Sequence, residues 1–139
     1  MVPRSGPSNG LGGDIVVKGE GFRPEQRYLC RLNGTVYDAI SFNWTEIRCP
    51  MVKAQDGDDF FGNVDFAVSA NGGSEWHTFA GGFQYYQQPN VVDIFPKTGP
   101  AHGLGIVNFY GSMFRTDYAS SQLACRIGQT IGTAVFVSN

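Results

Sequence analysis

Hydrophobic and polar positions alternate in short bursts along the chain, and glycine-rich stretches separate the bursts. In residues 64–69 (VDFAVS), Val64, Phe66 and Val68 fall on one face of an extended strand and the intervening residues fall on the other. Asn33-Gly34 is typical of a two-residue hairpin loop. Further strands are predicted at residues 14–18, 28–32, 35–42, 46–49 and 82–86. This spacing predicts an all-β fold of the β-sandwich class, although an open barrel would show the same pattern.

Composition supports the all-β prediction. The chain has 139 residues, of which 19 are glycine, and its aromatic residues are 11 Phe, 6 Tyr and 2 Trp. Glycine suits tight turns and aromatic side chains suit pleated, half-buried surfaces, so this composition excludes a helical bundle. Hydrophobic residues account for 42% of the chain, which is enough to form a core.

The charge balance excludes one class of partner. Ten Lys and Arg residues against 12 Asp and Glu residues give a net charge of −2. Nucleic acid is not expected as a partner, because neutralising phosphates requires clustered Lys and Arg. No apolar run reaches the roughly 18–20 residues of a transmembrane helix, so direct membrane insertion is not expected either.

Two parts of the chain repeat the same pattern. Residues 2–12 (VPRSGPSNGLG) and residues 95–105 (FPKTGPAHGLG) share their Pro, Gly-Pro and Gly-Leu-Gly positions. The match continues from Gly19, Phe22-Arg23, Cys30-Arg31-Leu32 and Thr35 to Gly111, Phe114-Arg115, Cys125-Arg126-Ile127 and Thr130. Tandem copies of one module account for these matches. We therefore predict one complete module at residues 1–89 and the N-terminal part of a second module at residues 90–139.

The incomplete second module leads to an expectation about the whole protein. Half a sandwich would expose its inner apolar face and its unpaired strand edges. We therefore expect the 139 residues to be an excerpt of a longer polypeptide; in the alternative, a neighbouring subunit donates strands to complete the module. Residues 1–13 contain no apolar stretch of the kind that a secretion signal needs, and an excerpt would explain this too.

The first module carries an ordered series of motifs. They are Pro3, Gly6-Pro7, Gly10, residues 15–19, Gly21-Phe22, Cys30, Ile47, Cys49-Pro50 and Phe83-Gln84-Tyr85. Their order resembles the IPT/TIG family, an immunoglobulin-like module of plexins and transcription factors that fibrocystin-type surface proteins carry in tandem arrays. The resemblance implies an immunoglobulin-like β-sandwich that serves for binding or as a spacer, and it does not imply catalysis.

The resemblance also implies a disulfide between Cys30 and Cys49, because Ile47-Arg48-Cys49-Pro50 matches the position of the family's paired cysteine. The two residues fall on neighbouring predicted strands, and a bridge would contribute about 3 kcal/mol by closing a loop of about 20 residues. Two free thiols of an intracellular protein are the alternative. Cys125 is left unpaired, and we expect its partner to lie beyond the chain.

Two segments match the N-glycosylation acceptor pattern N-x-[ST]. These are Asn33-Gly34-Thr35 and Asn43-Trp44-Thr45. Each lies at a predicted turn or strand end, so we expect both asparagines to be exposed and at least one to carry an N-linked glycan. For Asn33 the alternative is a plain hairpin turn.

Other candidate chemistry is weak in this sequence. The histidines are His77 and His102 and no C-x-x-C pair exists, so zinc is not expected. Residues 56–59 (DGDD) lack the ligand spacing of a calcium loop. Residues 10–13 (GLGG) precede a strand and not a helix, which argues against a phosphate cradle. We predict no catalytic residues, no metal and no cofactor.

We therefore predict a non-enzymatic structural or adhesive segment of an extracellular or cell-surface glycoprotein. Its expected partners are other modules of the same polypeptide or neighbouring subunits, together with N-linked glycans. One alternative is an intracellular IPT module used for dimerisation or partner binding. Another is an accessory carbohydrate-binding module of a glycosidase, which would need an exposed aromatic pair from the following residues: Trp44, Trp76, Tyr85 and Tyr86.

Overall fold

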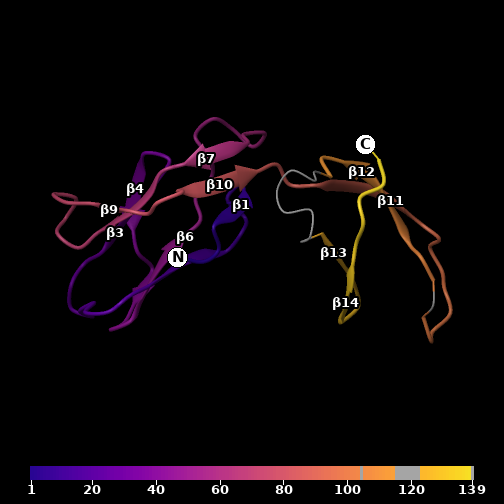
Figure 1. Ribbon diagram of the computed structural model, residues 1–139, viewed down its shortest axis with the longest axis horizontal. Coiled ribbons are helices and arrows are strands. Elements are labelled where there is room, and N and C mark those ends of the chain that lie inside the picture. The colour runs from indigo at the N-terminus through magenta and orange to yellow at the C-terminus, as the bar shows by residue number, and fades with distance from the viewer. Residues whose placement is uncertain (104, 115–122, 139) are drawn as a thin grey trace. The chain divides into compact units, whose positions relative to one another are not determined.

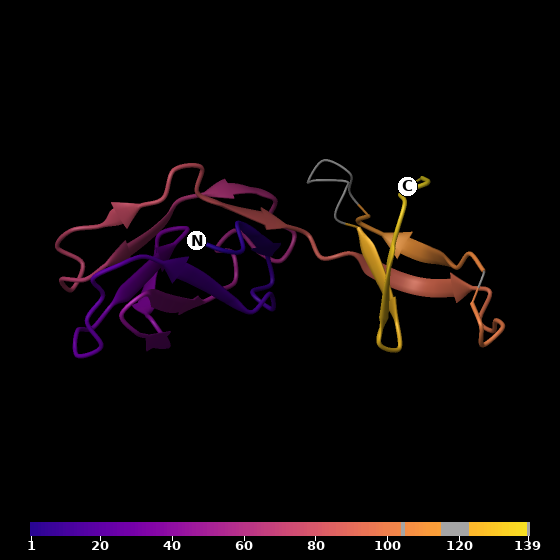
Figure 2. The ribbon, with the colours of Figure 1, turned by 60° about the horizontal axis from the view of Figure 1, so that its bottom comes forward.

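The structure is a computed structural model that describes residues 1–103, 105–114 and 123–138 (Figure 1, Figure 2). Leu104 and Arg115 of the repeated pattern, together with Asn139, lie outside these residues. The chain divides into two compact units, Met1–Gln88 and Pro89–Asn139, so the boundary falls one residue before the predicted one. The secondary structure of the described residues consists of strands without helices, which confirms the all-β class.

Unit 1 contains ten short strands in three hydrogen-bonded sheets. The first sheet has the order β2-β6-β5, the second β4-β3-β8-β9 and the third β1-β10-β7. Asp65 alone separates β7 from β8, so the second and third sheets share one run of chain. The strands are β1 (Ser5–Pro7), β2 (Asp14–Lys18), β3 (Leu29–Leu32), β4 (Thr35–Asp38), β5 (Ser41–Phe42), β6 (Glu46–Pro50), β7 (Gly62–Val64), β8 (Phe66–Ser69), β9 (His77–Thr78) and β10 (Phe83–Tyr86).

The core of unit 1 forms where the inner faces of these sheets meet. Alternate residues of each strand point inward, as the period of two requires. The first sheet contributes Ile15, Val17, Ile47 and Cys49. The other two sheets contribute Cys30, Leu32, Val64, Phe66, Val68, Phe83 and Tyr85. This packing of sheet on sheet is consistent with the β-sandwich class.

Burial along residues 64–69 departs from the predicted alternation. Val64, Phe66 and Val68 are buried as predicted, but Ala67 and Ser69, predicted on the solvent face, are buried as well. At Ser69 the cause is the loop after β8, whose backbone folds back onto the Ser69 hydroxyl. Its Gly73 N–H donates a 3.0 Å hydrogen bond to Ser69 Oγ.

The hairpin between β3 and β4 has the loop that the sequence predicts. Asn33 and Gly34 both adopt positive φ, at 49° and 80°, and the strands pair from Leu32 with Thr35 onward. Both values belong to the left-handed region that a two-residue loop of this type needs. Asparagine and glycine tolerate this region better than other residues do.

Unit 2 contains two separate two-stranded sheets. One pairs β11 (Asn90–Phe95) with β12 (Asn108–Ser112), and the other pairs β13 (Ala124–Ile127) with β14 (Thr130–Thr133). Both pairs are antiparallel.

The hairpin β13–β14 of unit 2 reproduces the hairpin β3–β4 of unit 1. Ile127 pairs with Thr130 across a two-residue loop, as Leu32 pairs with Thr35. One hydrogen bond beyond the hairpins also recurs: Ala39 N–H donates to Tyr28 O, and Ala134 N–H donates to Leu123 O, both at 3.0 Å. The internal repeat seen in the sequence is therefore a repeat of structure in this part of the chain.

A second correspondence joins the segments that precede the repeated prolines. In unit 1, Val2 forms an antiparallel bridge to Val16 of β2. In unit 2, Phe95 at the end of β11 pairs with Asn108 of β12. The sequence alignment places these two pairs at equivalent positions.

The burial of equivalent residues differs sharply between the units. Leu32 is fully buried, whereas its counterpart Ile127 is 61% exposed. In unit 1, β8 pairs with β3 within the sheet and β6 lies opposite β3 across the disulfide, and no strand takes their places in the described part of unit 2. Unit 2 therefore exposes a set of large apolar residues: Val91, Val92, Ile94, Phe95, Ile106, Tyr110, Met113, Ile127, Ile131, Val135 and Val137.

Candidate functional site

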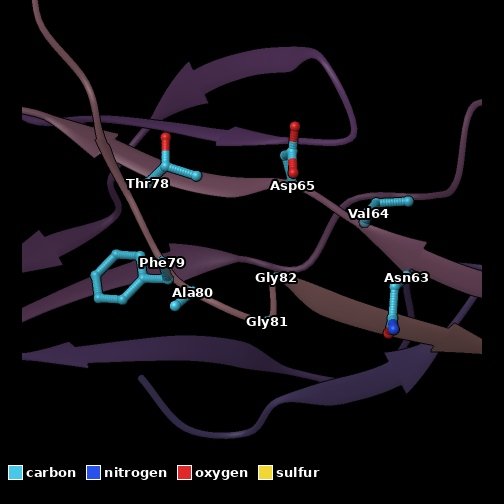
Figure 3. Close-up of a pocket in the computed structure, with 8 residues that line it drawn as sticks. All are labelled: Asn63, Val64, Asp65, Thr78, Phe79, Ala80, Gly81 and Gly82. Carbon is cyan, nitrogen blue, oxygen red and sulfur yellow. The ribbon is translucent and has the colours of Figure 1, made fainter.

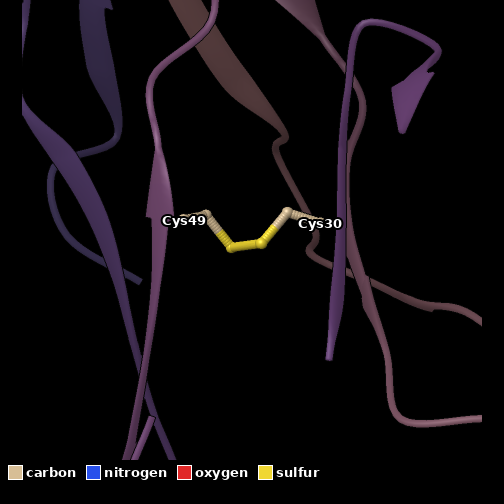
Figure 4. The surroundings of a disulfide bond; sticks show 2 residues. All are labelled: Cys30 and Cys49. Atoms are coloured by element: carbon tan, nitrogen blue, oxygen red, sulfur yellow. A yellow bond between two sulfur atoms is a disulfide. The ribbon is translucent and has the colours of Figure 1, made fainter. Parts of the chain in front are cut away.

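A disulfide between Cys30 and Cys49 crosses the core of unit 1 (Figure 4). The Cα atoms lie 6.0 Å apart, and both residues are fully buried. The sequence suggested neighbouring strands, but β3 and β6 belong to different sheets. The bond therefore ties the two layers together through the interior, and it is not a link along one sheet.

The backbone around each cysteine explains why the two side chains meet. Cys30 sits between Tyr37 and Val68 in its sheet, and Cys49 pairs with Ile15 in the other. All five positions belong to strands whose pleat directs the cysteines inward. The bridge spans 19 residues of sequence, and a loop of that size corresponds to about 3 kcal/mol of stabilisation in the loop-entropy account.

Cys125 on β13 is a free, partly buried thiol. Its Sγ lies 3.8 Å from the carbonyl oxygen of Gly132, to which it donates a weak hydrogen bond. It occupies the place in its hairpin that Cys30 occupies in unit 1. A disulfide partner beyond the chain stays a prediction.

The two glycosylation sequons have different environments. Asn43 and Thr45 are exposed in the turn between β5 and β6. Asn33 is only partly exposed, and its Nδ2 is shielded from solvent and has no hydrogen-bond partner. Asn43 is thus exposed as expected, whereas Asn33 is exposed only in part and its amide nitrogen is shielded.

The aromatic residues considered for sugar binding lie in separate environments. Tyr85 is fully buried, and its hydroxyl donates a 2.7 Å hydrogen bond to the carbonyl oxygen of Val52. The guanidinium of Arg31 lies 4.6 Å from the ring centre of Trp76. Tyr86 is partly buried, and Trp44 is 63% exposed. Tyr85 thus serves the core, and Arg31 covers one face of Trp76.

The buried Tyr85 and the partly buried Tyr37 carry perturbed hydroxyl groups. Burial raises the pKa of Tyr85 to about 12. Burial also raises the pKa of Tyr37 above its ordinary range, and the nearby Tyr85 adds to that rise. The Tyr37 hydroxyl is shielded from solvent and has no hydrogen-bond partner. Both groups therefore favour the neutral phenol at ordinary pH.

A shallow pocket of about 470 Å³ lies beside the junction of β7 and β8 (Figure 3). The carboxylate of Asp65 and the hydroxyl of Thr78 lie on one side of it, across from Phe79. Its full lining is Asn63, Val64, Asp65, Thr78, Phe79, Ala80, Gly81 and Gly82. Neither histidine of the chain belongs to this lining. One carboxylate, one hydroxyl and one amide offer no paired acid and base.

The acidic loop at residues 56–59 is held by contacts that direct its groups apart. Lys53 Nζ lies 2.9 Å from Asp58 Oδ1, and the Ser8 hydroxyl donates to the Asp58 carbonyl oxygen. Gln87 Nε2 donates a 2.7 Å hydrogen bond to the carbonyl oxygen of Asp59. Across the described ranges, no cluster of three or more His, Cys, Asp or Glu residues could hold a metal ion.

Gly10 is required for packing. Its φ is +78°, and a Cβ at this position would lie 2.7 Å from the backbone nitrogen of Lys53. A side chain would therefore collide with the backbone of the neighbouring loop. This close approach explains the first glycine of residues 10–13 by packing, without a phosphate cradle.

Comparison of the chain with protein-family models, with curated proteins and with solved structures found no match. Within the described residues, no helix is long and apolar enough to cross a membrane. The features that bear on function are therefore the disulfide across the core, the tandem repeat, the sequons and the exposed face of unit 2.

Proposed function

We propose that this chain is a non-enzymatic structural or adhesive segment of an extracellular or cell-surface glycoprotein built from immunoglobulin-like modules of the IPT/TIG type. The observation that carries the proposal is the fully buried disulfide between Cys30 and Cys49 in a repeated module. Disulfides of this kind form and persist in oxidising compartments. Repeated β-modules suit roles in which a protein must span distance or present surfaces.

The arrangement of unit 1 supports the immunoglobulin-like part of the proposal. Short antiparallel strands form facing sheets, and a disulfide joins the layers, as in immunoglobulin domains. One hallmark of antibody domains is missing, because Trp44 is exposed and Trp76 lies on the outer face, so neither packs against the bridge.

The connection between the units supports a tandem array. Three residues separate the end of β10 at Tyr86 from the start of β11 at Asn90. Gln87 donates to the loop at Asp59, and the Gln88 side chain accepts a 2.6 Å hydrogen bond from Asn9 Nδ2. Two of the three connecting residues are therefore anchored to unit 1.

The exposed face of unit 2 supports partners that consist of further β-strands. Ile127 is 61% exposed, whereas its counterpart Leu32 is fully buried, and exposed apolar surface of this kind marks an interaction site. In unit 1 the equivalent hairpin is completed by β8 beside it and by β6 across the core, so strands equivalent to these would cover the face of unit 2. We assign these strands to another module of the same polypeptide or to a neighbouring subunit.

The redox part of the proposal is tested by counting thiols in the protein recovered from its natural source. The protein is unfolded and alkylated without reduction, the peptides that carry Cys30, Cys49 and Cys125 are analysed by mass spectrometry, and the measurement is repeated after reduction. Before reduction we expect a label on Cys125 alone, or on no cysteine if Cys125 is bonded to a partner. After reduction we expect all three cysteines to be labelled. Three labelled cysteines in the unreduced but unfolded chain would overturn an extracellular function.

The assignment of the covering strands is tested by adding the second half of unit 1 to the end of the chain. Residues 1–138 are followed by a second copy of residues 44–88, in the register of the repeat. We expect a new disulfide from Cys125 to the added cysteine and slow amide exchange at Ile127. A control with that added cysteine replaced by serine retains a free Cys125. Free thiols and fast exchange in the extended chain would contradict the assignment.

A further inference from the structure

We propose that Asn43, and not Asn33, carries an N-linked oligosaccharide in this protein. The inference rests on the proposed extracellular function and adds to it the place of modification. It comes from the different surroundings of the two amide nitrogens, because both residues satisfy the same sequence pattern.

The turn that carries Asn43 is held in place by its backbone. Asn43 N–H donates a 2.8 Å hydrogen bond to Glu46 O, which closes the turn between β5 and β6. Gly19 N–H donates a 3.0 Å hydrogen bond to Thr45 O, which fixes the turn against the end of β2. The sequon is therefore presented by an ordered turn at the surface.

The side chains of this sequon leave the acceptor nitrogen available. Asn43 Oδ1 accepts a hydrogen bond from Thr45 N–H at 2.9 Å and another from the Thr45 hydroxyl at 3.2 Å. Both bonds engage the oxygen of the amide and leave its Nδ2 outside them, on an exposed residue. Asn43, Trp44 and Thr45 are all exposed, which leaves room for a branched sugar.

Asn33 lies in a turn that shields its amide nitrogen from solvent. Its N–H donates a 3.1 Å hydrogen bond to Asp65 O, which ties the hairpin loop to the junction of β7 and β8. Its Nδ2 has no access to solvent. A sugar on that nitrogen would need the space that packed atoms occupy, and protein interiors have no such space to spare.

The chemistry of transfer is the same at both sites. Nδ2 bonds to C1 of an oligosaccharide carried on a polyprenyl diphosphate, the C1–O bond breaks, and the lipid diphosphate leaves with the electron pair. The nitrogen gives one proton to a base of the transferase. Transfer to the unfolded chain does not depend on burial, but a chain modified at Asn33 would have to leave its native hairpin. Selection against such chains leaves a folded population modified at Asn43.

The test expresses the full chain behind a cleavable secretion signal in animal cells. Thr45→Val removes the sequon at Asn43 without changing the asparagine, and Thr35→Val does the same at Asn33. We expect peptide N-glycosidase to reduce the mass of the secreted parent chain and of the Thr35→Val chain. The Thr45→Val chain shows no change. Because the enzyme leaves Asp at the modified position, peptide mapping identifies Asn43 directly.

Two results would overturn the inference: a glycan on Asn33 in the folded, secreted chain, or an unmodified Asn43 in a chain that is secreted with its disulfide formed. The second result leaves the proposed function in place, because the thiol count tests that function separately. If a variant is not secreted, translation of the full chain with endoplasmic-reticulum membranes measures transfer at each asparagine. In that assay, modification at Asn43 supports the inference, and the absence of modification at Asn43 contradicts it.

Discussion

Cys30 and Cys125 occupy the same position in two hairpins of identical register, yet one is bonded and fully buried and the other is free. Cys30 faces Tyr37 across its hairpin, and Cys125 faces Gly132. The local structure is the same in both, so the difference lies in what packs against the hairpin. In unit 1 that partner is β6 with Cys49, and its absence from the described part of unit 2 leaves the thiol of Cys125 free.

Replacing Cys30 and Cys49 together by alanine is expected to lower the free energy of unfolding of unit 1 by about 2–5 kcal/mol. The loss comes from the extra freedom of the unfolded chain and from the small cavity between the sheets. Urea unfolding followed by circular dichroism measures it. Cys125→Ser serves as the control and leaves the transition of unit 1 unchanged. Equal midpoints for the double variant and the parent chain would contradict the structural role.

The equivalent residues Leu32 and Ile127 provide a matched pair of substitutions. Leu32→Ala is expected to cost about 2–5 kcal/mol, because it opens a cavity in a closed core. Ile127→Ala is expected to cost less than about 0.5 kcal/mol, because the side chain is 61% exposed. Chemical denaturation of each variant gives the two values. Similar losses at both positions would mean that another part of the protein covers the face of unit 2.

Gly34→Ala tests the hairpin loop. The position has a φ of +80°, and the nearest atom to an added Cβ would be Gln55 Nε2 at 3.9 Å, so the cost is conformational and not steric. We expect a loss of about 1–2 kcal/mol in thermal or urea unfolding. Gly99→Ala is the control, because a Cβ there meets no atom within 4 Å and its φ is not positive. A loss at Gly99 that matches the loss at Gly34 would argue against this account.

Alkaline pH is expected to destabilise unit 1 through Tyr85. Burial raises its pKa to about 12, whereas an unfolded tyrosine ionises near pH 10. The unfolded chain therefore releases its proton first, and stability that is fully present below about pH 10 is lost as the pH rises towards about 12. Tyr37, whose pKa is also raised by burial, acts in the same direction.

The measurement is the urea midpoint as a function of pH for the parent chain and for Tyr85→Phe. The variant loses the hydrogen bond to Val52, so it starts about 1 kcal/mol less stable at neutral pH. Its stability then falls less steeply above about pH 10, because one ionisable group has gone. Parallel curves for the two chains would show that Tyr85 does not cause the alkaline loss.

The strands with strong local signals were predictable from the sequence. β2 spans the predicted residues 14–18, and Asn33-Gly34 forms the predicted loop between β3 and β4. The alternation of apolar residues and the tolerance of these two residues for positive φ are local properties. Because both properties depend on a few consecutive residues, they can be recognised directly in the sequence.

Other strands exist only because a partner strand lies beside them. β1 contains Ser5, Gly6 and Pro7 and shows no alternation, but it pairs in parallel with β10, which is 79 residues away in sequence. β9 has two residues and becomes a strand by pairing with β8. The predicted segment 35–42 is divided into β4 and β5, because the chain changes sheets between them: Ala39 N–H still donates to Tyr28 O, whereas Ile40 N–H donates to Arg48 O of β6.

The sequence by itself determined the all-β class, the repeated pattern and the two glycosylation sequons, while the pairing of Cys30 with Cys49 was an implication of the family resemblance. Only the tertiary structure decided that the disulfide crosses the core between layers and that the amide nitrogen of Asn33 is shielded while Asn43 is exposed. The reason is physical. Turn preference and apolar alternation depend on a few consecutive residues, whereas burial of an atom depends on segments that approach it from elsewhere in the chain.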